Sequence, residues 1–239
     1  MAGIFGGVLV YLAVLAQFLT VKAPGSWLCC SKNNKAKYEF EKFAMWYSVV
    51  WISVFGVVVA GQHYEYFDET HYMGLCVTLA LPFLLQPFFD PMPGEKNLPL
   101  HARYSFKANV WLAIFSFIGN YWYTHYFYSV LRARYTFPSW RLNDVPIPLY
   151  FATHFYFVFY HTMANVILRK IETRYAIGTA RSLFFWSTIF AFAYFTAFME
   201  TLTISSFPDY SFEDRYMAYT VGSAFYGLYF IVSYPTFYR

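Results

Sequence analysis

The chain has 239 residues, of which 59% are hydrophobic, 25% are aromatic and only 13% are charged. Soluble domains carry about 25% charged residues, so this composition excludes an ordinary soluble protein and predicts an integral membrane protein. The net charge of +4 comes from lysines and arginines gathered between hydrophobic runs, which suits a lipid bilayer with anionic headgroups. No nucleic-acid partner is expected. The predicted fold class is an all-α polytopic bundle of about seven transmembrane helices.

The whole chain, 1–239, is predicted to form a single membrane domain. Its first hydrophobic run lies within 1–22 and is expected to be a retained span with its N-terminus outside, because almost no positive charge precedes it. A basic linker over 23–42 follows, and its lysines place it on the cytosolic side. The remaining residues, 43–239, are predicted to form a core of six spans.

The six spans of this core are predicted from hydrophobic runs that are long enough to cross a bilayer. One of them contains Pro82 and Pro87, so we expect a kinked or shortened helix there. The runs cover 43–61, 73–89, 109–131, a stretch that ends at Arg169, 183–205 and 216–238.

Positive charge predicts the orientation of the spans. The linkers expected in the cytosol, because Lys and Arg gather in them, are 22–42, 90–107 and 169–182. The loop 132–144 is an exception, since it has three arginines on the other side. This topology places a few polar side chains from three spans near one level in the outer half of the membrane, where they could converge. They are Asn120, His125, His154 and Glu200.

Two of the predicted spans carry a polar face inside an aromatic coat. At helical spacing, one face of the run 109–131 collects Asn109, Ser116, Asn120 and Thr124. The following span repeats the spacing with His154, His161 and Asn165. Polar groups are costly in hydrocarbon and mark functional sites in membrane proteins, although interhelical hydrogen bonding is the structural alternative for each of them.

Glu200 is the sharpest candidate for chemistry, because it lies well inside a hydrophobic run. Removal from water disfavours the charged form, so a buried carboxyl can stay a neutral acid near neutral pH. The alternatives are that Glu200 reaches the membrane interface or pairs with Arg215. His154 and His161 are two helical turns apart, too far for one metal centre, and no metal site is expected.

Single residues of the sequence argue for or against other classes of membrane protein. A retinal protein is excluded because the last predicted span has no lysine for a Schiff base. Proton-coupled transport remains an alternative, since buried Glu and His residues serve carriers as well. No nucleotide-binding or metalloprotease motif is present, so no cofactor is expected.

Several segments together resemble the cycloeucalenol cycloisomerase family, the cyclopropyl sterol isomerases. The resemblance rests on GNYWYTHYF, YTFPSW and FYH, followed by MET and FPDYSFEDR in that order, and it covers the chain from about Trp27 to Arg239. The span within 1–22 is additional to the plant pattern, and the family's C-terminal hydrophobic stretch has no counterpart in these 239 residues.

The resemblance implies opening of the 9β,19-cyclopropane ring of a sterol such as cycloeucalenol, giving the Δ8 sterol obtusifoliol, by an intramolecular lyase of the endoplasmic reticulum membrane. From the chemistry and the expected depths, we predict Glu200 as acid and His125 or His154 as base, although the sequence leaves open which group is acid and which is base. The residues expected to bind the sterol are Asn120, Trp122, Tyr123, His161 and Asn165. A non-catalytic sterol-binding protein is the remaining alternative, and the oligomeric state is left open.

Overall fold

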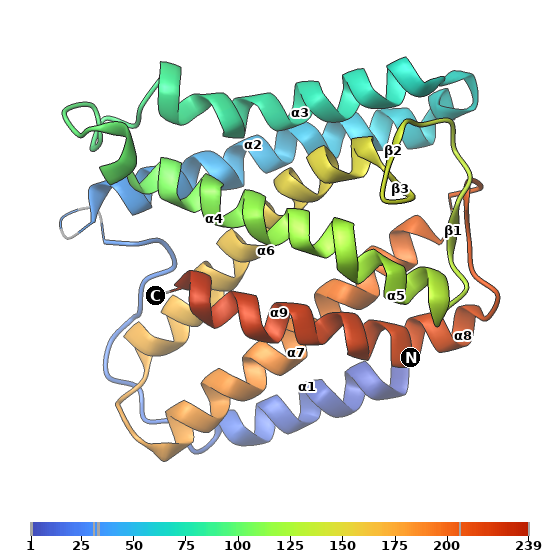
Figure 1. Ribbon diagram of the computed structural model, residues 1–239. Helices are drawn as coiled ribbons and strands as arrows, with labels where there is room; N and C mark the ends of the chain where they lie inside the picture. The colour runs from blue at the N-terminus through green and yellow to red at the C-terminus, as the bar shows by residue number, and fades with distance from the viewer. Residues whose placement is uncertain (1, 31, 33, 206, 239) are drawn as a thin grey trace. The chain divides into compact units, whose positions relative to one another are not determined.

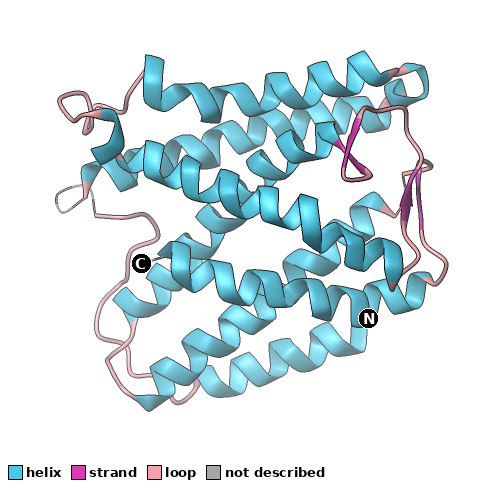
Figure 2. Cartoon of the chain, viewed as in Figure 1, coloured by secondary structure: helices cyan, strands magenta, loops and turns pink. Residues whose placement is uncertain are grey.

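A computed structural model describes residues 2–30, 32, 34–205 and 207–238. The chain forms two compact units. Unit 1 comprises Met1–Cys29, Leu131–Ala133 and Met163–Arg239, and unit 2 comprises Cys30–Val130 and Arg134–Thr162. Helices account for nearly all regular structure in both units (Figure 2), which confirms the predicted all-helical fold.

Unit 2 contains most of the N-terminal half of the chain (Figure 1). The long helix α6 begins in unit 2 and continues into unit 1. The elements of unit 2 are α2 (Lys35–Ala60), the 3₁₀ turn η1 (His63–Tyr66), α3 (Glu69–Phe89), the 3₁₀ turn η2 (Leu100–Ala102), α4 (Tyr104–Ile118), the π-helical segment η3 (Gly119–Tyr123), α5 (Thr124–Ser129), the short strands β1 (Arg134–Tyr135), β2 (Arg141–Leu142) and β3 (Val145–Pro146), and α6 (Ile147–Arg174).

Unit 1 contains the first helix and the C-terminal part of the chain. In Figure 1, α7 and α9 pass close to each other, and α1 lies along α7. The elements are α1 (Ala2–Ala16), α7 (Thr179–Ile204), the short strand β4 (Tyr210–Ser211), α8 (Arg215–Met217), the π-helical segment η4 (Ala218–Gly222) and α9 (Ser223–Tyr238).

Membrane character is supported by three helices of the described chain, α2, α3 and α7, which are long and apolar enough to cross a bilayer by length and composition. The apolar part of α1, Gly3–Ala16, is shorter. The predicted membrane protein therefore has candidate spans in both units. The total of about seven spans stays a prediction.

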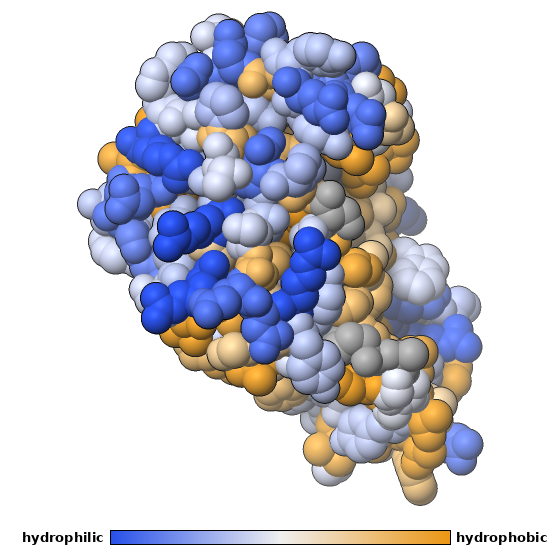
Figure 3. Space-filling model, turned by 90° about the vertical axis from the view of Figure 1, so that its right-hand side faces the viewer, coloured by the Kyte–Doolittle hydropathy of each residue, from blue (hydrophilic) through white to orange (hydrophobic). Residues whose placement is uncertain are grey.

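Large apolar side chains remain exposed on the candidate spans. They include Trp46, Val49, Val57, Leu183, Trp186 and Phe190. Exposed apolar surface of this kind is unfavourable in water but suits the lipid tails of a bilayer. One face of the molecule is drawn in Figure 3, where hydrophilic residues gather on the left and hydrophobic residues reach the surface toward the right edge.

Helix α2 begins at Lys35 and therefore includes part of the basic linker predicted over 23–42. Asn34 caps the helix by accepting a 3.0 Å hydrogen bond from the Lys37 backbone N–H. The basic stretch is helical because it has an apolar face to bury: Phe40 and Ala44 are both inaccessible to solvent.

The core of unit 2 is built from aromatic rings on α2 and the first half of α6. The Trp51 ring lies 5.1 Å from Phe155 and 4.7 Å from Tyr156, measured between ring centroids. Such tilted and edge-on pairs contribute about 1 kcal/mol each beyond the area they bury. Phe155 is fully buried, so this cluster holds the part of α6 that carries His154.

The polar face predicted on the fourth span is buried. Its members Asn109, Ser116, Asn120 and Thr124 all belong to the core of unit 2. The π-helical turns of η3 interrupt the α-helical register between Gly119 and Tyr123, and the Thr124 hydroxyl donates to the Gly119 carbonyl at 3.3 Å. Segments of π-helix occur frequently at functional sites, because they shift the side chains that follow around the helix axis.

The third predicted span is helical over its full length. Pro82 and Pro87 lie within α3, which runs to Phe89, so the helix is not shortened. Prolines remove backbone hydrogen bonds, but the carbonyls that they release can find other donors. The Pro87 carbonyl, in the last turn of α3, has no α-helical donor because residue 91 is also a proline, and the Arg103 guanidinium donates to it instead.

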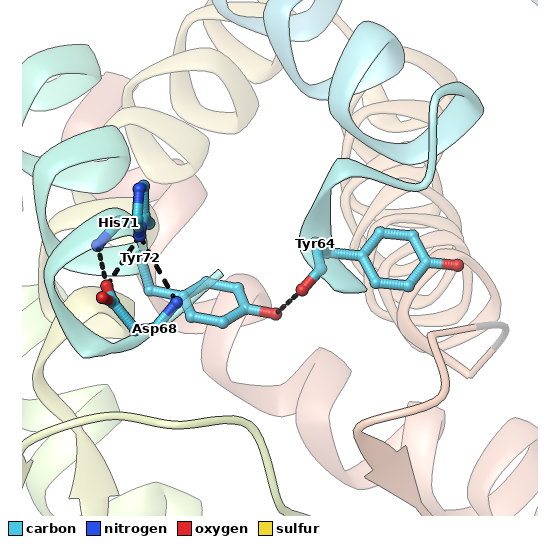
Figure 4. Close-up of polar contacts among 4 residues, drawn as sticks. All are labelled: Tyr64, Asp68, His71 and Tyr72. Carbon is cyan, nitrogen blue, oxygen red and sulfur yellow. Dashed lines mark hydrogen bonds and ion pairs between the residues drawn. The ribbon is translucent and has the colours of Figure 1, made fainter. Parts of the chain in front are cut away.

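Helix α3 begins with a capping box on the acidic loop before it (Figure 4). The Asp68 carboxylate accepts a 2.9 Å hydrogen bond from the His71 backbone N–H, and the His71 Nδ1 lies 2.7 Å from the same oxygen. Next to this cap, the Tyr72 hydroxyl donates to the Tyr64 carbonyl at 3.4 Å. The contacts with His71 lower the pKa of Asp68 below its usual 3.8.

The cap predicts a local pH dependence. Since the pKa of Asp68 is lower in the folded protein, its stabilisation is complete above the unfolded value of 3.8 and is lost as pH falls through the folded value. Hydrogen exchange of the first-turn amides of α3 should therefore accelerate in strong acid, relative to helices without such a cap. The Asp68→Asn variant should lack this acceleration, because Asn also caps helices but does not titrate. Equal acid sensitivity in both proteins would contradict the assignment.

In unit 1, α1 and α9 pack on α7 through aromatic rings. The Phe5 ring lies 4.9 Å from Phe198. On the side of α9, the Phe192 ring lies 5.4 Å from Tyr234, whose hydroxyl donates to the Thr196 hydroxyl at 2.9 Å. These contacts keep the polar side chains of α7 and α9 next to each other.

Candidate functional site

The polar faces of α4 and α6 meet at His154. Its Nε2 lies 2.9 Å from the Oδ1 of Asn109, and the two side chains are 3% and 5% exposed. The amide of Asn109 is itself held, because its Nδ2 donates to the Ser105 carbonyl at 2.9 Å. The other ring nitrogen of His154, Nδ1, is buried and has no hydrogen-bond partner among the described residues. One ring nitrogen of His154 therefore makes a hydrogen bond, and the other makes none with the described residues.

Asn120 lies further along the same polar face of α4, within the π-helical segment η3. Its Nδ2 donates to the Ser116 carbonyl at 2.9 Å, and its Oδ1 accepts a 3.4 Å contact from the Thr153 hydroxyl of α6. The neighbours of Asn120 in η3 are less buried: Tyr123 is half-buried and Trp122 is 60% exposed. Asn120 thus faces α6, whereas Trp122 lies at the surface.

His125, in the first turn of α5, is held by a tight hairpin. Strands β2 and β3 pair antiparallel, and the residues between them, Asn143 and Asp144, have positive φ angles of 53° and 60°. Two such residues make the turn that hairpins of this length prefer. The Nε2 of His125 lies 3.1 Å from the Asn143 carbonyl, and the Asn143 amide donates to the Tyr121 carbonyl. His125 is half-buried and anchors the hairpin.

His161 and Asn165 continue the polar face of α6. His161 is fully buried, its Nδ1 donates to the Phe157 carbonyl at 2.7 Å, and its ring lies 5.6 Å from Trp111. Asn165 is also buried, and neither atom of its amide has a hydrogen-bond partner in the described part of the chain. A buried amide without partners is uncommon and calls for a water, an ion or a ligand group.

Glu200 lies in unit 1, on the side of α7 that meets α9. Both oxygens of its carboxyl group accept from the Tyr226 hydroxyl, at 3.3 and 3.2 Å. Tyr226 is buried and Glu200 is half-buried. The carboxyl group thus has a partner inside the helix pair rather than only at the membrane interface.

The structure brings some of the predicted site residues together. His154 meets Asn109, and Asn120 meets Thr153, all within unit 2. His125 belongs to the same unit, whereas Glu200 and Asn165 belong to unit 1. The convergence of Glu200 with the histidines stays a prediction.

A small apolar hollow in unit 1 has essentially no room for even a water-sized molecule. Ligand pockets usually have about 300–1,000 Å³, so this hollow is too small for a complete sterol. Its lining residues are Ala164, Ile167, Leu168, Thr188, Ile189, Phe192 and Tyr234.

Comparison with known proteins gives one extensive similarity. The chain is 40% identical over 220 residues to a protein of Arabidopsis thaliana named cycloeucalenol cycloisomerase, and the match covers 91% of this chain and 78% of that protein. The chain belongs to the cycloeucalenol cycloisomerase family. No family model and no solved structure matches it.

Membership of the cycloeucalenol cycloisomerase family confirms the resemblance predicted from the sequence. The segment GNYWYTHYF, on which that resemblance rested, forms η3 and the start of α5, where Asn120 and His125 lie. The segment MET ends near the C-terminus of α7 and contains Glu200. The family segments therefore include the polar candidates of both units.

Two partners were missed as site residues in the sequence. Asn109 was recognised only as a member of the polar face of α4, although its position on that face was the signal that could have paired it with His154. Tyr226 gave no signal, because it is one of 24 tyrosines in an aromatic-rich chain. Its contact with Glu200 depends on how α9 packs on α7.

Proposed function

We propose that this protein opens the 9β,19-cyclopropane ring of a cycloeucalenol-type sterol by acid–base catalysis and forms the Δ8 sterol obtusifoliol. The observation that carries the proposal is 40% identity with the named cycloisomerase over 91% of the chain. The reaction is an intramolecular lyase step without net oxidation or reduction, and acid–base groups suffice for it. We further propose a multi-pass protein of the endoplasmic reticulum with about seven spans, because the other apolar helices would join the three candidates.

The chemistry requires a strong acid at carbon. A cyclopropane has no lone pair to accept a proton, so the acid must be delivered to the strained carbon in a site that excludes water. Protonation of C19 breaks the C9–C19 bond and leaves a positive charge at C9. Loss of the proton from C8 then forms the Δ8 double bond. One proton enters and one leaves, so the formula of the sterol is unchanged.

Glu200 is our proposed acid. Its partner Tyr226 holds the carboxyl group in place, because the tyrosine hydroxyl lies 3.3 and 3.2 Å from the two carboxyl oxygens. Its half-buried position on α7 also keeps the carboxyl group partly out of water, as delivery of a proton to carbon requires.

His154 is our proposed base, in preference to His125. His154 has a buried ring nitrogen with no partner among the described residues, whereas His125 is half-buried and bound to the hairpin carbonyl of Asn143. A neutral imidazole is a suitable base near neutral pH. The cycle closes when the imidazolium releases the C8 proton to solvent and Glu200 takes up a proton from solvent.

The remaining candidates are proposed to bind the sterol. Asn165 has the strongest support, because both of its amide atoms are buried and without partners in the described chain, so they can bind a sterol hydroxyl. His161 would shape an aromatic wall with Trp111. In the π-helical segment η3, the residues proposed to contact the sterol are Asn120, Tyr123 and Trp122.

The proposal is tested by conversion of a defined sterol. Microsomes from a sterol-auxotrophic host that expresses the protein should convert cycloeucalenol to obtusifoliol, and in deuterated water one deuterium should appear in the C19 methyl group. The control is the same host without the protein. Product analysis by gas chromatography and mass spectrometry measures both the yield and the label.

Unchanged cycloeucalenol at normal protein levels would contradict the proposal. Saturable binding of the sterol without conversion would support the alternative of a sterol-binding protein. Sterol-independent proton movement in vesicles would support a transporter. Product without label at C19 would support the isomerase activity but contradict protonation by an acid that exchanges its proton with solvent.

A further inference from the structure

We infer that Asn109 is a positioning residue that fixes which nitrogen of His154 acts as the base. The inference deepens the proposed isomerase and rests on it. It is based on a series of buried hydrogen bonds that runs from the start of α4 to the His154 ring.

The amide of Asn109 has only one orientation that satisfies both of its contacts. Its Nδ2 group can donate but not accept, and it faces the Ser105 carbonyl at 2.9 Å, which can only accept. Oδ1 must therefore face His154. The reversed amide would place two acceptors together at Ser105, and a buried acceptor left without a donor costs about 1–3 kcal/mol.

The orientation of the amide decides the tautomer of His154. Since Oδ1 can only accept, the nitrogen that faces it, Nε2, must carry the hydrogen. In the neutral ring the lone pair then belongs to Nδ1. Nδ1 is the buried nitrogen that has no partner within the described residues. Asn109 thus leaves the lone pair on the nitrogen that no described residue engages, which is the one that would take the substrate proton.

The start of α4, which holds Asn109, is itself held by Glu95. The buried carboxylate of Glu95 accepts from the Ser105 backbone N–H at 2.8 Å and from its hydroxyl at 2.6 Å. Glu95 thereby caps a helix whose own preceding residue, Arg103, gives no side-chain cap. Glu95 and Ser105 are both fully buried, so the carbonyl that holds Asn109 lies on a rigid turn.

The amide also helps after the base has acted. When Nδ1 takes a proton, the ring becomes a cation whose Nε2–H group already donates to an amide oxygen. Hydrogen bonds to the charged form favour it. Asn109 therefore supports the imidazolium that the reaction forms, without touching the sterol.

Two variants and a control test this inference in the full-length protein, purified and reconstituted in lipid nanodiscs. Asn109→Leu removes the amide, so we expect kcat to fall about 10-fold or more with KM little changed, because both tautomers become available and the imidazolium loses its acceptor. Asn109→Asp keeps an acceptor for Nε2–H but places a second acceptor opposite the Ser105 carbonyl, so activity should be retained in part. The acidic limb of the pH profile, which reports protonation of the base, should move. Ser48→Ala removes a buried hydroxyl that donates to the Ala44 carbonyl of its own helix, and it should leave kcat unchanged.

A spectroscopic measurement reports the tautomer without any turnover. In protein labelled with ¹⁵N-histidine, two-bond ¹H–¹⁵N correlations assigned with a His154→Gln variant should show hydrogen on Nε2 in the wild type. Asn109→Leu should shift the signal toward a mixture of tautomers. If Asn109→Leu fails to fold, the wild-type spectrum and the Asn109→Asp pH profile still decide.

The outcomes separate this inference from the proposed function. An active wild type with hydrogen on Nδ1, or full kcat in Asn109→Leu, would overturn the role of Asn109 and leave the isomerase intact. An Asn109→Asp pH profile identical to that of the wild type would also count against it. A wild type that converts no sterol would refute the isomerase, while an Nε2–H signal would still support the inferred tautomer.

Discussion

The Glu200→Gln variant is expected to lose obtusifoliol formation by about 1,000-fold, within the usual range of about 100- to 10,000-fold for removal of a general acid. Glutamine keeps an oxygen that can accept from Tyr226, so the packing of α7 on α9 should be preserved. It has no proton to deliver to C19. The measurement is the rate of product formation per mole of purified protein in nanodiscs, with melting temperature recorded for both proteins.

A matched control for Glu200 lies in the same unit. Glu172 is also half-buried and also accepts from a tyrosine, since the Tyr238 hydroxyl donates to its Oε2 at 2.6 Å. Glu172→Gln should therefore keep wild-type turnover, although it makes the same chemical change. Full activity of Glu200→Gln, or equal losses in the two variants, would remove Glu200 from the role of acid.

The His154→Gln variant is expected to lose about 100-fold or more of kcat. The glutamine amide can reach the position of Nε2 and donate to Asn109, so the variant should fold, but it offers no basic nitrogen. Loss of the base stalls the reaction after C19 is protonated. We therefore expect KM to change less than kcat, measured by initial rates over a range of cycloeucalenol concentrations.

An exposed histidine of the same unit serves as the comparison for His154. His101, in η2, is exposed, and His101→Gln should turn over at the wild-type rate. If His154→Gln retains activity while His125→Gln is inactive, the base is His125 and the proposed assignment of the two histidines is reversed.

Much of the helical plan could be predicted from hydrophobic runs. Helix boundaries depend on more than the hydrophobic runs: α2 begins at Lys35, and its first turns bury Lys37 and Glu41 despite their charge. Asp214, in the acidic loop before α8, caps that helix by accepting from the Met217 backbone N–H at 2.9 Å. Such a cap depends only on residues that are neighbours in the sequence.

The candidate site could be predicted only in part. Helical spacing placed Asn109 and Asn120 on one face of α4, and both are buried. Spacing gave no preference between His125 and His154. The structure distinguishes them, because one binds a hairpin carbonyl and the other has an open buried nitrogen.

The amino-acid sequence by itself determined the all-helical membrane class, the polar faces of the fourth and fifth predicted spans and the family. These follow from composition, from the periodicity of polar residues along a helix and from ordered segments of sequence. Only the tertiary structure decided that Asn109 faces His154 and that Tyr226 faces Glu200. Periodicity fixes the face on which a side chain lies, whereas its partner depends on the rotation and depth at which a neighbouring helix packs.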